Sequence, residues 1–334
     1  MNKNKTTYKL LELMSDGRFH SGQDLGQTLG ITRSGVWKAI QQLDALGLEI
    51  HAVTGKGYRL PQGLELLNEE VIKQQLDADS SHRIQQLDLL TVTSSTNDYL
   101  LKLMKRQPLR TDNIACLAEY QTGSRGRLGR TWVSSFGSSL YLSLLWHFAK
   151  DPSEIVGLSL TTALAVVRSL RSYGIDNHLQ LKWPNDVLWK GRKLAGVLID
   201  LVAESHGRCY VVIGIGLNVQ MPYHVGKEIS QPWADISQIL HSKPERNKLA
   251  GLLLNELAHL LPEFERYGLK PLLPEWQTYD PIIGKSVTLT TPQNKIVGVV
   301  QGISAQGELI LLTENNEVKH LMSGEVSLRL GQNV

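Results

Sequence analysis

The segment from Gly123 to Arg130 alternates glycine with arginine and contains no apolar face that a fold could bury. Arg125, Arg127 and Arg130 carry planar guanidinium groups, which bind phosphate and carboxylate groups through pairs of parallel hydrogen bonds. Gly126 stands between two of these arginines and lets the backbone approach a ligand closely, because glycine has no Cβ. The segment therefore predicts a loop that binds an anionic ligand.

Two other interpretations of this loop are weaker. A dinucleotide-binding glycine turn needs a helix directly afterwards, whereas residues 139–146 are apolar and typical of a strand. An arginine-glycine tract that binds nucleic acid is usually repeated and disordered, and here the pattern occurs once.

Two lysines and a carboxylate stand at the starts of strands farther along the chain. Lys182 precedes Asp186, and Lys193 lies in the second strand of a hairpin predicted over residues 187–200. Each lysine alone is typical of a solvated surface. Together with the three arginines they suit an anionic substrate such as a nucleotide better than they suit stability. No convincing Ser-His-Asp or Cys-His arrangement accompanies them, so we expect a site that orients and stabilises its ligands.

A junction between a strand and a helix adds a further candidate. Residues 84–92 predict a strand, and Ser95 then caps a helix whose free amides and positive end point toward the carboxyl end of that strand. An ordinary capped helix is an equally good interpretation of these residues alone. At residues 214–218, two glycines allow close approach to a flat ligand, and Asn218 offers an amide.

The first sixty residues predict three short helices followed by a hairpin. Ser21 begins the second helix and Gly30 ends it, and Thr32 caps the third. A short turn between two helices whose second member has a polar face is typical of a recognition helix in the major groove. The groove-reading candidates on that helix are Arg33, Ser34, Trp37, Lys38 and Gln41.

The hairpin after the third helix predicts a wing. Residues 49–53 and 58–60 read as strands around a glycine-flanked turn, where Lys56 could meet a DNA phosphate. A protein-docking module is the alternative interpretation of the same pattern.

Composition limits where such partners can bind. The chain has 334 residues and a formal net charge of only +3, so a DNA-binding surface must be a local patch. No apolar run approaches the roughly 18 residues of a membrane span, and the N-terminus does not resemble a signal peptide. Cys116 and Cys209 lie in apolar strand-like runs, which favours buried free thiols. These observations indicate a cytoplasmic protein without membrane partners.

Over nearly its whole length the chain resembles the biotin protein ligase family, in the long form with an N-terminal repressor domain. Four blocks occur in the family's order and spacing: Ser95 to Asn97, Gln121 with residues 124–132, residues 182–186 followed by 192–196, and residues 214–218. One departure is Ser124, where the family has glycine. The backbone there must accept a Cβ, and loop flexibility or retention of the intermediate could differ.

The resemblance implies an α+β multi-domain fold. Residues 1–63 would form a winged helix-turn-helix domain and residues 64–282 a mixed α/β catalytic domain. Residues 283–334 would form a small SH3-like β-barrel. Strands predicted at residues 287–290, 297–303, 308–313 and 318–322 support the barrel. Within the central domain, the residue pattern predicts a linking helix over residues 64–78, a long amphipathic helix over residues 153–173 and a strand over residues 210–213.

The resemblance also implies roles for the candidate residues. Those expected at biotin are Ser95, Thr96, Asn97, Gln121, Arg125, Gly126, Arg127 and Lys193. Those expected at the nucleotide are Arg127, Arg130, Trp132, Lys182, Asn218 and Arg329. The catalytic set is Lys193, Arg125, Arg127 and Asp186, with Asp186 positioning the acceptor lysine.

The implied reaction needs no enzyme nucleophile. Biotin's carboxylate attacks the α-phosphorus of ATP, and a lysine of biotin carboxyl carrier protein then attacks the mixed anhydride and releases AMP. Magnesium would be held mainly by the phosphates, without a protein metal site. The implied partners are the carrier protein, operator DNA and a second copy of the chain when biotinyl-AMP is bound.

Two rival functions remain at this stage. A lipoate or octanoyl transferase shares the fold, but it would need a longer apolar tunnel and would lack the block at Ser95 to Asn97. A repressor with an inactive catalytic domain is disfavoured because the arginines and Lys193 are present.

Overall fold

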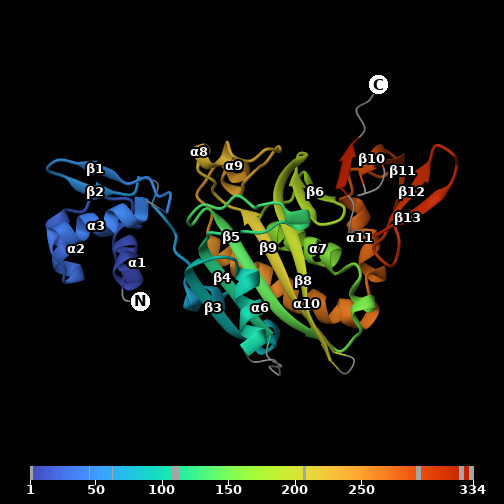
Figure 1. Ribbon diagram of the computed structural model, residues 1–334, viewed down its shortest axis with the longest axis horizontal. Coiled ribbons are helices and arrows are strands. Elements are labelled where there is room, and N and C mark those ends of the chain that lie inside the picture. The colour runs from blue at the N-terminus through green and yellow to red at the C-terminus, as the bar shows by residue number, and fades with distance from the viewer. Residues whose placement is uncertain are drawn as a thin grey trace.

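The computed structural model describes residues 3–44, 46–61, 63–106, 113–205, 208–290, 295–322 and 327–330. Figure 1 shows three parts in chain order along the longest axis. A small helical unit with a hairpin comes first, a large sheet with helices occupies the middle, and a smaller sheet comes last.

The N-terminal part has the predicted helices and wing. It comprises α1 (Lys3–Met14), α2 (Gly22–Leu29), α3 (Arg33–Asp44), β1 (His51–Val53) and β2 (Gly57–Arg59).

The predicted helix signals of this part are confirmed. The Ser21 side chain accepts a hydrogen bond from the backbone N–H of Asp24 and so caps α2, which ends at Gly30 with φ of 65°. The hydroxyl of Thr32 accepts a hydrogen bond from the backbone N–H of Gly35 at the start of α3. Strands β1 and β2 pair antiparallel as the wing.

The link to the central part differs from the prediction. The sequence predicts one helix over residues 64–78, but residues 64–68 have no regular secondary structure, and α4 (Glu69–Gln74) and α5 (Ala78–Arg83) follow as two short helices. The stretch before α4 is held by side chains far away in the sequence. Glu119 accepts from the backbone N–H of Leu67 at 2.6 Å, and Asn247 accepts from that of Asn68 at 2.8 Å.

The central sheet has seven strands in the order β3-β4-β5-β9-β8-β7-β6. Its strands are β3 (Ile84–Thr93), β4 (Asn113–Gln121), β5 (Ser139–Phe148), β6 (Leu179–Lys182), β7 (Asp186–Trp189), β8 (Arg192–Ser205) and β9 (Arg208–Asn218). Strands β3 and β4 run parallel, and the other neighbours pair antiparallel. The strand after residue 210 is longer than predicted, because residues 214–218 continue it.

Helices cover both faces of this sheet. On β4, Ala115 and Leu117 face the large core beneath α7 (Leu158–Ser172) and α10 (Arg246–Tyr267), while Ile114 and Cys116 face α6 (Thr96–Arg106). This alternation follows from the two-residue period of a strand. Short helices α8 (Tyr223–Gly226), α9 (Ile236–Leu240) and α11 (Leu273–Thr278) complete the part, together with 3-10 turns at Arg127–Gly129, Pro152–Ile155 and Lys270–Leu272.

The long helix predicted over residues 153–173 is interrupted. Gly157 adopts φ of 92°, so the 3-10 turn Pro152–Ile155 is separate from α7. Among the described residues, one stretch, Pro152–Ser172, is long and apolar enough to cross a membrane, yet 61% of its apolar window is buried. Because α7 packs against α10, we interpret this stretch as a core helix.

The C-terminal part is an antiparallel five-stranded sheet in the order β13-β12-β11-β10-β14. Its strands are β10 (Ser286–Thr290), β11 (Lys295–Ile303), β12 (Leu309–Thr313), β13 (Val318–Leu321) and β14 (Ser327–Leu330). Four were predicted, whereas β14 was not. The indole N–H of Trp183 donates to the carbonyl of Gly307 at 3.1 Å and so joins this part to the central one.

Candidate functional site

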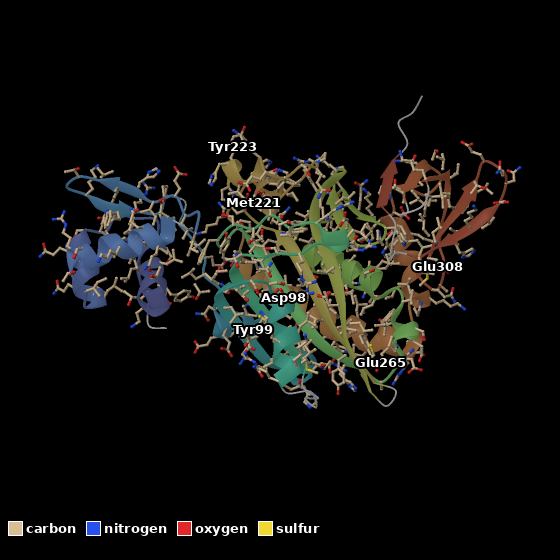
Figure 2. All side chains as sticks on the ribbon, viewed as in Figure 1. Asp98, Tyr99, Met221, Tyr223, Glu265 and Glu308 are labelled. Carbon is tan, nitrogen blue, oxygen red and sulfur yellow. The ribbon has the colours of Figure 1, made fainter. Side chains whose placement is uncertain are left out.

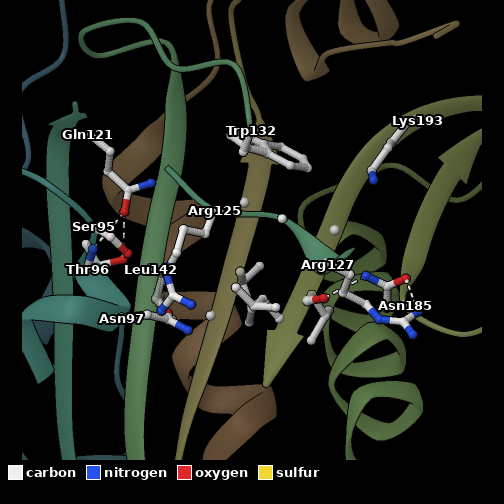
Figure 3. A pocket seen from close by; sticks show the side chains of 17 residues that line it. Ser95, Thr96, Asn97, Gln121, Arg125, Arg127, Trp132, Leu142, Asn185 and Lys193 are labelled. Atoms are coloured by element: carbon white, nitrogen blue, oxygen red, sulfur yellow. Dashed lines mark hydrogen bonds between the residues drawn. The ribbon is translucent and has the colours of Figure 1, made fainter. Parts of the chain in front are cut away.

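Two adjoining pockets open beside the central sheet. The first pocket lies over α6, β4, β8 and β9 and is closed on one side by the loop after β4 (Figure 3). The second pocket extends from it toward Lys182, Asp186 and Asn218. Both are lined by Gly126, Arg127, Trp132, Asn185 and Lys193, which therefore form a shared wall.

The residues predicted for biotin and those predicted for the nucleotide line different pockets. All of the residues predicted for biotin line the first pocket. All of those predicted for the nucleotide line the second, except Arg329, whose side chain lies outside the described ones. Arg127, which is expected at both ligands, and Lys193, which is expected at biotin and in catalysis, lie where the pockets meet.

Polar side chains at one end of the first pocket are held by one another. The Gln121 carbonyl oxygen accepts from the Thr96 backbone N–H at 2.7 Å and from the Thr96 hydroxyl at 3.1 Å. The Gln121 amide nitrogen donates to Ser124 Oγ at 3.3 Å. Ser124, the departure from the family pattern, is thus buried and fixes the orientation of the Gln121 amide.

Asn97 continues this network. Its Oδ1 lies 2.5 Å from Ser143 Oγ, and its amide nitrogen donates to Asp200 Oδ2 at 2.9 Å. A Cβ at Gly214 would lie 2.3 Å from Asn97 Oδ1, so only glycine fits beneath this side chain. Close approach of the Asn97 side chain therefore requires glycine at this position, and Gly214 also lines the first pocket.

Trp132 likewise packs directly on backbone that carries no Cβ. Its ring lies over β8 and β9, where a Cβ at Gly216 would come within 2.7 Å and one at Gly196 within 3.0 Å. Lys193 Nζ lies 5.4 Å from the centroid of the ring (Figure 3). The glycines of both strands therefore create the space that holds Trp132 between the two pockets.

Lys193 is paired with Asp186 across the β7–β8 hairpin. Lys193 Nζ lies 2.7 Å from Asp186 Oδ1, and both side chains are less than one-fifth exposed. Arg127 donates to Asn185 Oδ1 at 3.3 Å. Burial lowers the pKa of Arg127, although Asp186 partly opposes that effect. A carboxylate or phosphate group bound at the wall between the pockets would therefore meet two half-buried cations, Lys193 and Arg127.

The glycine-arginine loop is folded into a tight turn. Arg125 and Thr131 form an isolated antiparallel bridge, and the backbone N–H of Gly126 donates to the carbonyl of Arg130 at 2.6 Å. Leu128, at φ of 56°, forms the exposed tip of the turn. The predicted loop is confirmed, and its arginines project from a defined backbone.

Three known protein families or domains match parts of the chain. The Biotin/lipoate A/B protein ligase family matches residues 89–218, the Biotin protein ligase C terminal domain matches residues 282–329, and an HTH domain matches residues 6–59. The bifunctional ligase/repressor BirA of Escherichia coli is 39% identical over 329 residues, which cover 98% of this chain and 99% of that protein. BirA of Bacillus subtilis is 32% identical over 332 residues, covering 96% and 97%.

The chain belongs to the biotin protein ligase family.

A solved structure supports the fold of this ligase. The biotin protein ligase of Aquifex aeolicus, in complex with biotin and ATP, superimposes with a TM-score of 0.61 at 28% identity. The match covers 74% of this chain and 100% of the Aquifex chain.

The N-terminal part of the ligase exposes every residue predicted to read DNA. On α3, the buried residues Val36, Ala39, Ile40 and Leu43 face inward. The residues on its exposed side include Arg33, Ser34, Trp37, Lys38 and Gln41. Lys56 is exposed in the wing, with Nζ 5.9 Å from the ring centroid of Phe19.

Sequence reasoning missed several polar residues of the ligase site. Asn185 lies between two predicted residues, so its place in that block was a usable signal. Asp98 and Asp200 contact Arg125, and Ser143 contacts Asn97, but these contacts join separate elements. Among the described residues, no group of three or more His, Cys, Asp or Glu could hold a metal ion.

Proposed function

We propose that this ligase forms biotinyl-5'-AMP from biotin and ATP in the two adjoining pockets and transfers the biotin to a lysine of biotin carboxyl carrier protein. The observation that carries the proposal is the shared wall. The first pocket holds the residues expected at biotin, the second holds those expected at the nucleotide, and Lys193 and Arg127 line both. A carboxylate in the first pocket would thus face an α-phosphate in the second.

In the first pocket, the ureido ring of biotin would lie against Ser95, Thr96, Asn97 and Gln121. The present network supports this position, because the Ser143 and Ser124 hydroxyls hold the amides of Asn97 and Gln121 in fixed orientations. Leu142 lies on the same wall and would contact apolar atoms of the ligand. Preorganised amides of this kind avoid the cost of ordering them on binding.

In the second pocket, the adenine would lie near Trp132 and Asn218, and the phosphates near Lys182, Arg127 and Arg130. The amide nitrogen of Asn218 donates to the carbonyl of Ala234 at 3.1 Å, so this side chain also holds the segment after β9 against the pocket. Arg329 would reach the nucleotide from the C-terminal part. Magnesium would be bound mainly by phosphate oxygens.

The first step would join the two ligands at the shared wall. An oxygen of the biotin carboxylate attacks the α-phosphorus of ATP, and pyrophosphate leaves. Lys193 would leave Asp186 to stabilise the negative charge on the carboxylate and on the phosphoryl oxygens. The Arg127 guanidinium would share that charge from the other side.

The second step would use the carboxylate that the first step exposes. Asp186, released from Lys193, would hold the ammonium of the acceptor lysine and take its proton. The free amine then attacks the acyl carbon of the mixed anhydride, and AMP leaves as an amide bond forms. The loop at residues 125–127 would shield the anhydride from water meanwhile.

A single incubation tests this reaction. The full chain, ATP, labelled biotin and a carrier protein should give label that stays on the carrier after denaturation and free AMP in equal amount. A lipoate or octanoyl transferase would label the carrier with lipoate or octanoate and not with biotin. Tight biotin binding without AMP release would instead indicate a sensor without catalysis.

We also propose that the N-terminal part makes the ligase a biotinyl-AMP-dependent repressor of biotin synthesis genes. The exposed residues of α3 and Lys56 of the wing would contact operator DNA. A homodimer formed with bound biotinyl-AMP would place two such units on a two-fold operator. The domain boundaries at residues 63 and 282 fit this division of tasks, and the protein would work in the cytoplasm.

A further inference from the structure

One guanidinium of the site is already bound by two carboxylates. Arg125 Nη2 lies 2.8 Å from Asp98 Oδ1 and 2.7 Å from Asp200 Oδ2. Asp98 lies in the first turn of α6 (Figure 2), and Asp200 lies in β8. A single side chain of the glycine-arginine loop therefore joins that loop to two elements that are distant in the sequence.

The Asp200 carboxylate is in turn held by a side chain of the first pocket. Its Oδ2 also accepts from the Asn97 amide at 2.9 Å, and Asn97 is buried at 4% exposure. The bare backbone at Gly214 leaves the room that Asn97 needs. The loop and one wall of the first pocket are thus linked through a single carboxylate oxygen.

This arrangement separates Arg125 from the other cations of the site. Lys193 has one carboxylate partner and lines both pockets, so it can exchange that partner for an anionic ligand. Arg125 has two carboxylate partners and lines only the first pocket. The pairing outweighs burial and raises the pKa of Arg125, which keeps the guanidinium charged. An added anion near it would meet a net negative cluster.

We propose that Asp98 and Asp200 are positioning residues of the ligase, which hold the loop at residues 124–130 over the first pocket through Arg125 and so retain biotinyl-AMP between the two steps. The inference rests on the proposed function of the pocket. Retention matters because the mixed anhydride reacts with water and with any amine once it leaves a closed site. The side chain of Arg125 would fasten the loop to α6 and β8, while its backbone would face the ligand.

Release of the intermediate gives a direct test. Labelled biotinyl-AMP is formed on the full chain, unlabelled biotinyl-AMP is added in excess, and the loss of bound label is followed with time. Asp200→Asn and Asp98→Asn should each release it about threefold faster, and the double variant about tenfold faster, because each change replaces a charged carboxylate partner of the partly exposed Arg125 with a neutral amide. Asp200→Glu, which restores the charge, should recover most of the retention.

Controls separate retention from general damage. Asp176→Asn removes a carboxylate from an exposed ion pair with Arg171 and should not change the release rate. Binding of ATP without biotin should be the same in all variants, since neither Asp98 nor Asp200 lines the second pocket. In a double-mutant cycle, Asp200→Asn should add little to Arg125→Gln, because both remove the same contact.

The possible results fall into distinct classes. If the unaltered chain forms no biotinyl-AMP, the proposed function fails. If the unaltered chain retains the intermediate and the two Asp→Asn variants release it no faster than the unaltered chain does, the positioning role is overturned while the pocket assignment stands. Fully additive effects in the cycle also overturn it, because Asp200 would then act by a route other than Arg125.

Discussion

At the scale of single residues, Lys193 and Asp186 form an ion pair that a bound ligand would separate. In the present structure the two charges neutralise each other at 2.7 Å. In the proposed reaction, an anionic ligand that binds Lys193 would free Asp186 for the incoming amine. The cation proposed for the first step and the carboxylate proposed for the second would then be stored as one ion pair.

Lys193→Ala should lower the rate of biotinyl-AMP formation by about a hundredfold, because one contact to the transition-state charge is worth roughly 3 kcal/mol. The variant should also leave Asp186 without its cation. Single-turnover release of pyrophosphate measures the effect. Lys190→Ala, at the exposed turn of the same hairpin, is the matched control and should react normally. A normal rate in the Lys193 variant would remove this lysine from the catalytic set.

Asp280 predicts a dependence of stability on pH. Burial raises its pKa to about 6, and its Oδ2 has no hydrogen-bond partner. The folded protein therefore holds this proton to higher pH than the unfolded chain, so the stabilisation is complete below about pH 4 and is lost as the pH rises through 6. Asp280→Asn keeps a neutral group at all pH values. It should raise the free energy of unfolding by on the order of 1–2 kcal/mol at about pH 8.

Denaturant unfolding of the Asp280 variant near pH 4 and near pH 8 checks the sign. No gain is expected at the lower pH, where the native carboxyl is already neutral. An equal gain at both values would point to packing and not to ionisation. Asp176→Asn, at an exposed carboxylate, serves as the reference.

At the scale of elements, a buried ion pair fastens the linker between the first two parts. Arg246 at the start of α10 lies 2.7 Å from Glu119 of β4, and the two side chains are 3% and 2% exposed. Glu119 also accepts from the Leu67 backbone, and Arg246 donates to the Glu65 carbonyl at 2.8 Å. Strand, helix and linker thus depend on one pair of charges.

Glu119→Ala should lower the free energy of unfolding by about 3–5 kcal/mol, because it leaves a buried guanidinium without its counter-charge. Chemical denaturation measures the loss. Glu245→Ala breaks a neighbouring exposed pair with Lys248 and should change stability by less than about 1 kcal/mol. Similar values for the two variants would show that the Glu119 pair is not important for stability.

At the scale of the whole molecule, the DNA-binding part is not a free appendage. Phe136, which follows the glycine-arginine loop, is 3% exposed and belongs to the same apolar core as Leu10, Leu25 and Val36. Leu64 contributes to that core from the linker. The segment that lines the pockets therefore leads directly into the contact between the two parts.

Deleting residues 1–60 should abolish specific operator binding and leave biotin ligation in place, because every groove-reading candidate lies in the deleted part. Gel-shift and carrier-labelling assays measure the two activities. The deletion also exposes Phe136, so Arg33→Ala with Lys38→Ala in the full chain is the folded control with the same expected pattern. Specific operator binding by the truncated chain would reject the assignment of residues 1–63.

A non-hydrolysable biotinyl-AMP analogue should promote both dimerisation and operator binding. Apart from Ser124, the loop at residues 124–130 buries no side chain, and we expect the intermediate to fix its position further and complete a dimer surface. An unmodified carrier protein should oppose both effects by consuming the intermediate. Sedimentation with and without the analogue measures the change. Unchanged molecular weight and operator affinity would reject this switch while leaving the ligase assignment intact.

Local chemistry determined much of this protein from its sequence alone. Helix caps such as Ser21 and Gly30 act within a few residues, so their patterns could be read directly. The blocks at Ser95 to Asn97, in the glycine-arginine loop and around Lys193 predicted the site, and the fold brings them together. Short-range signals of this kind need no knowledge of how distant segments pack.

Tertiary structure alone decided which partner each of these groups has. Residues 64–68 are not helical, and Glu119 and Asn247 bind the backbone at the end of this stretch. The glycine at 214 makes room for Asn97, and Arg125 is bound by Asp98 and Asp200 from other elements. Such contacts depend on strand order and register, which place residues far apart in the chain side by side. A residue's type sets what it can bind, and the topology of the fold sets what lies within its reach.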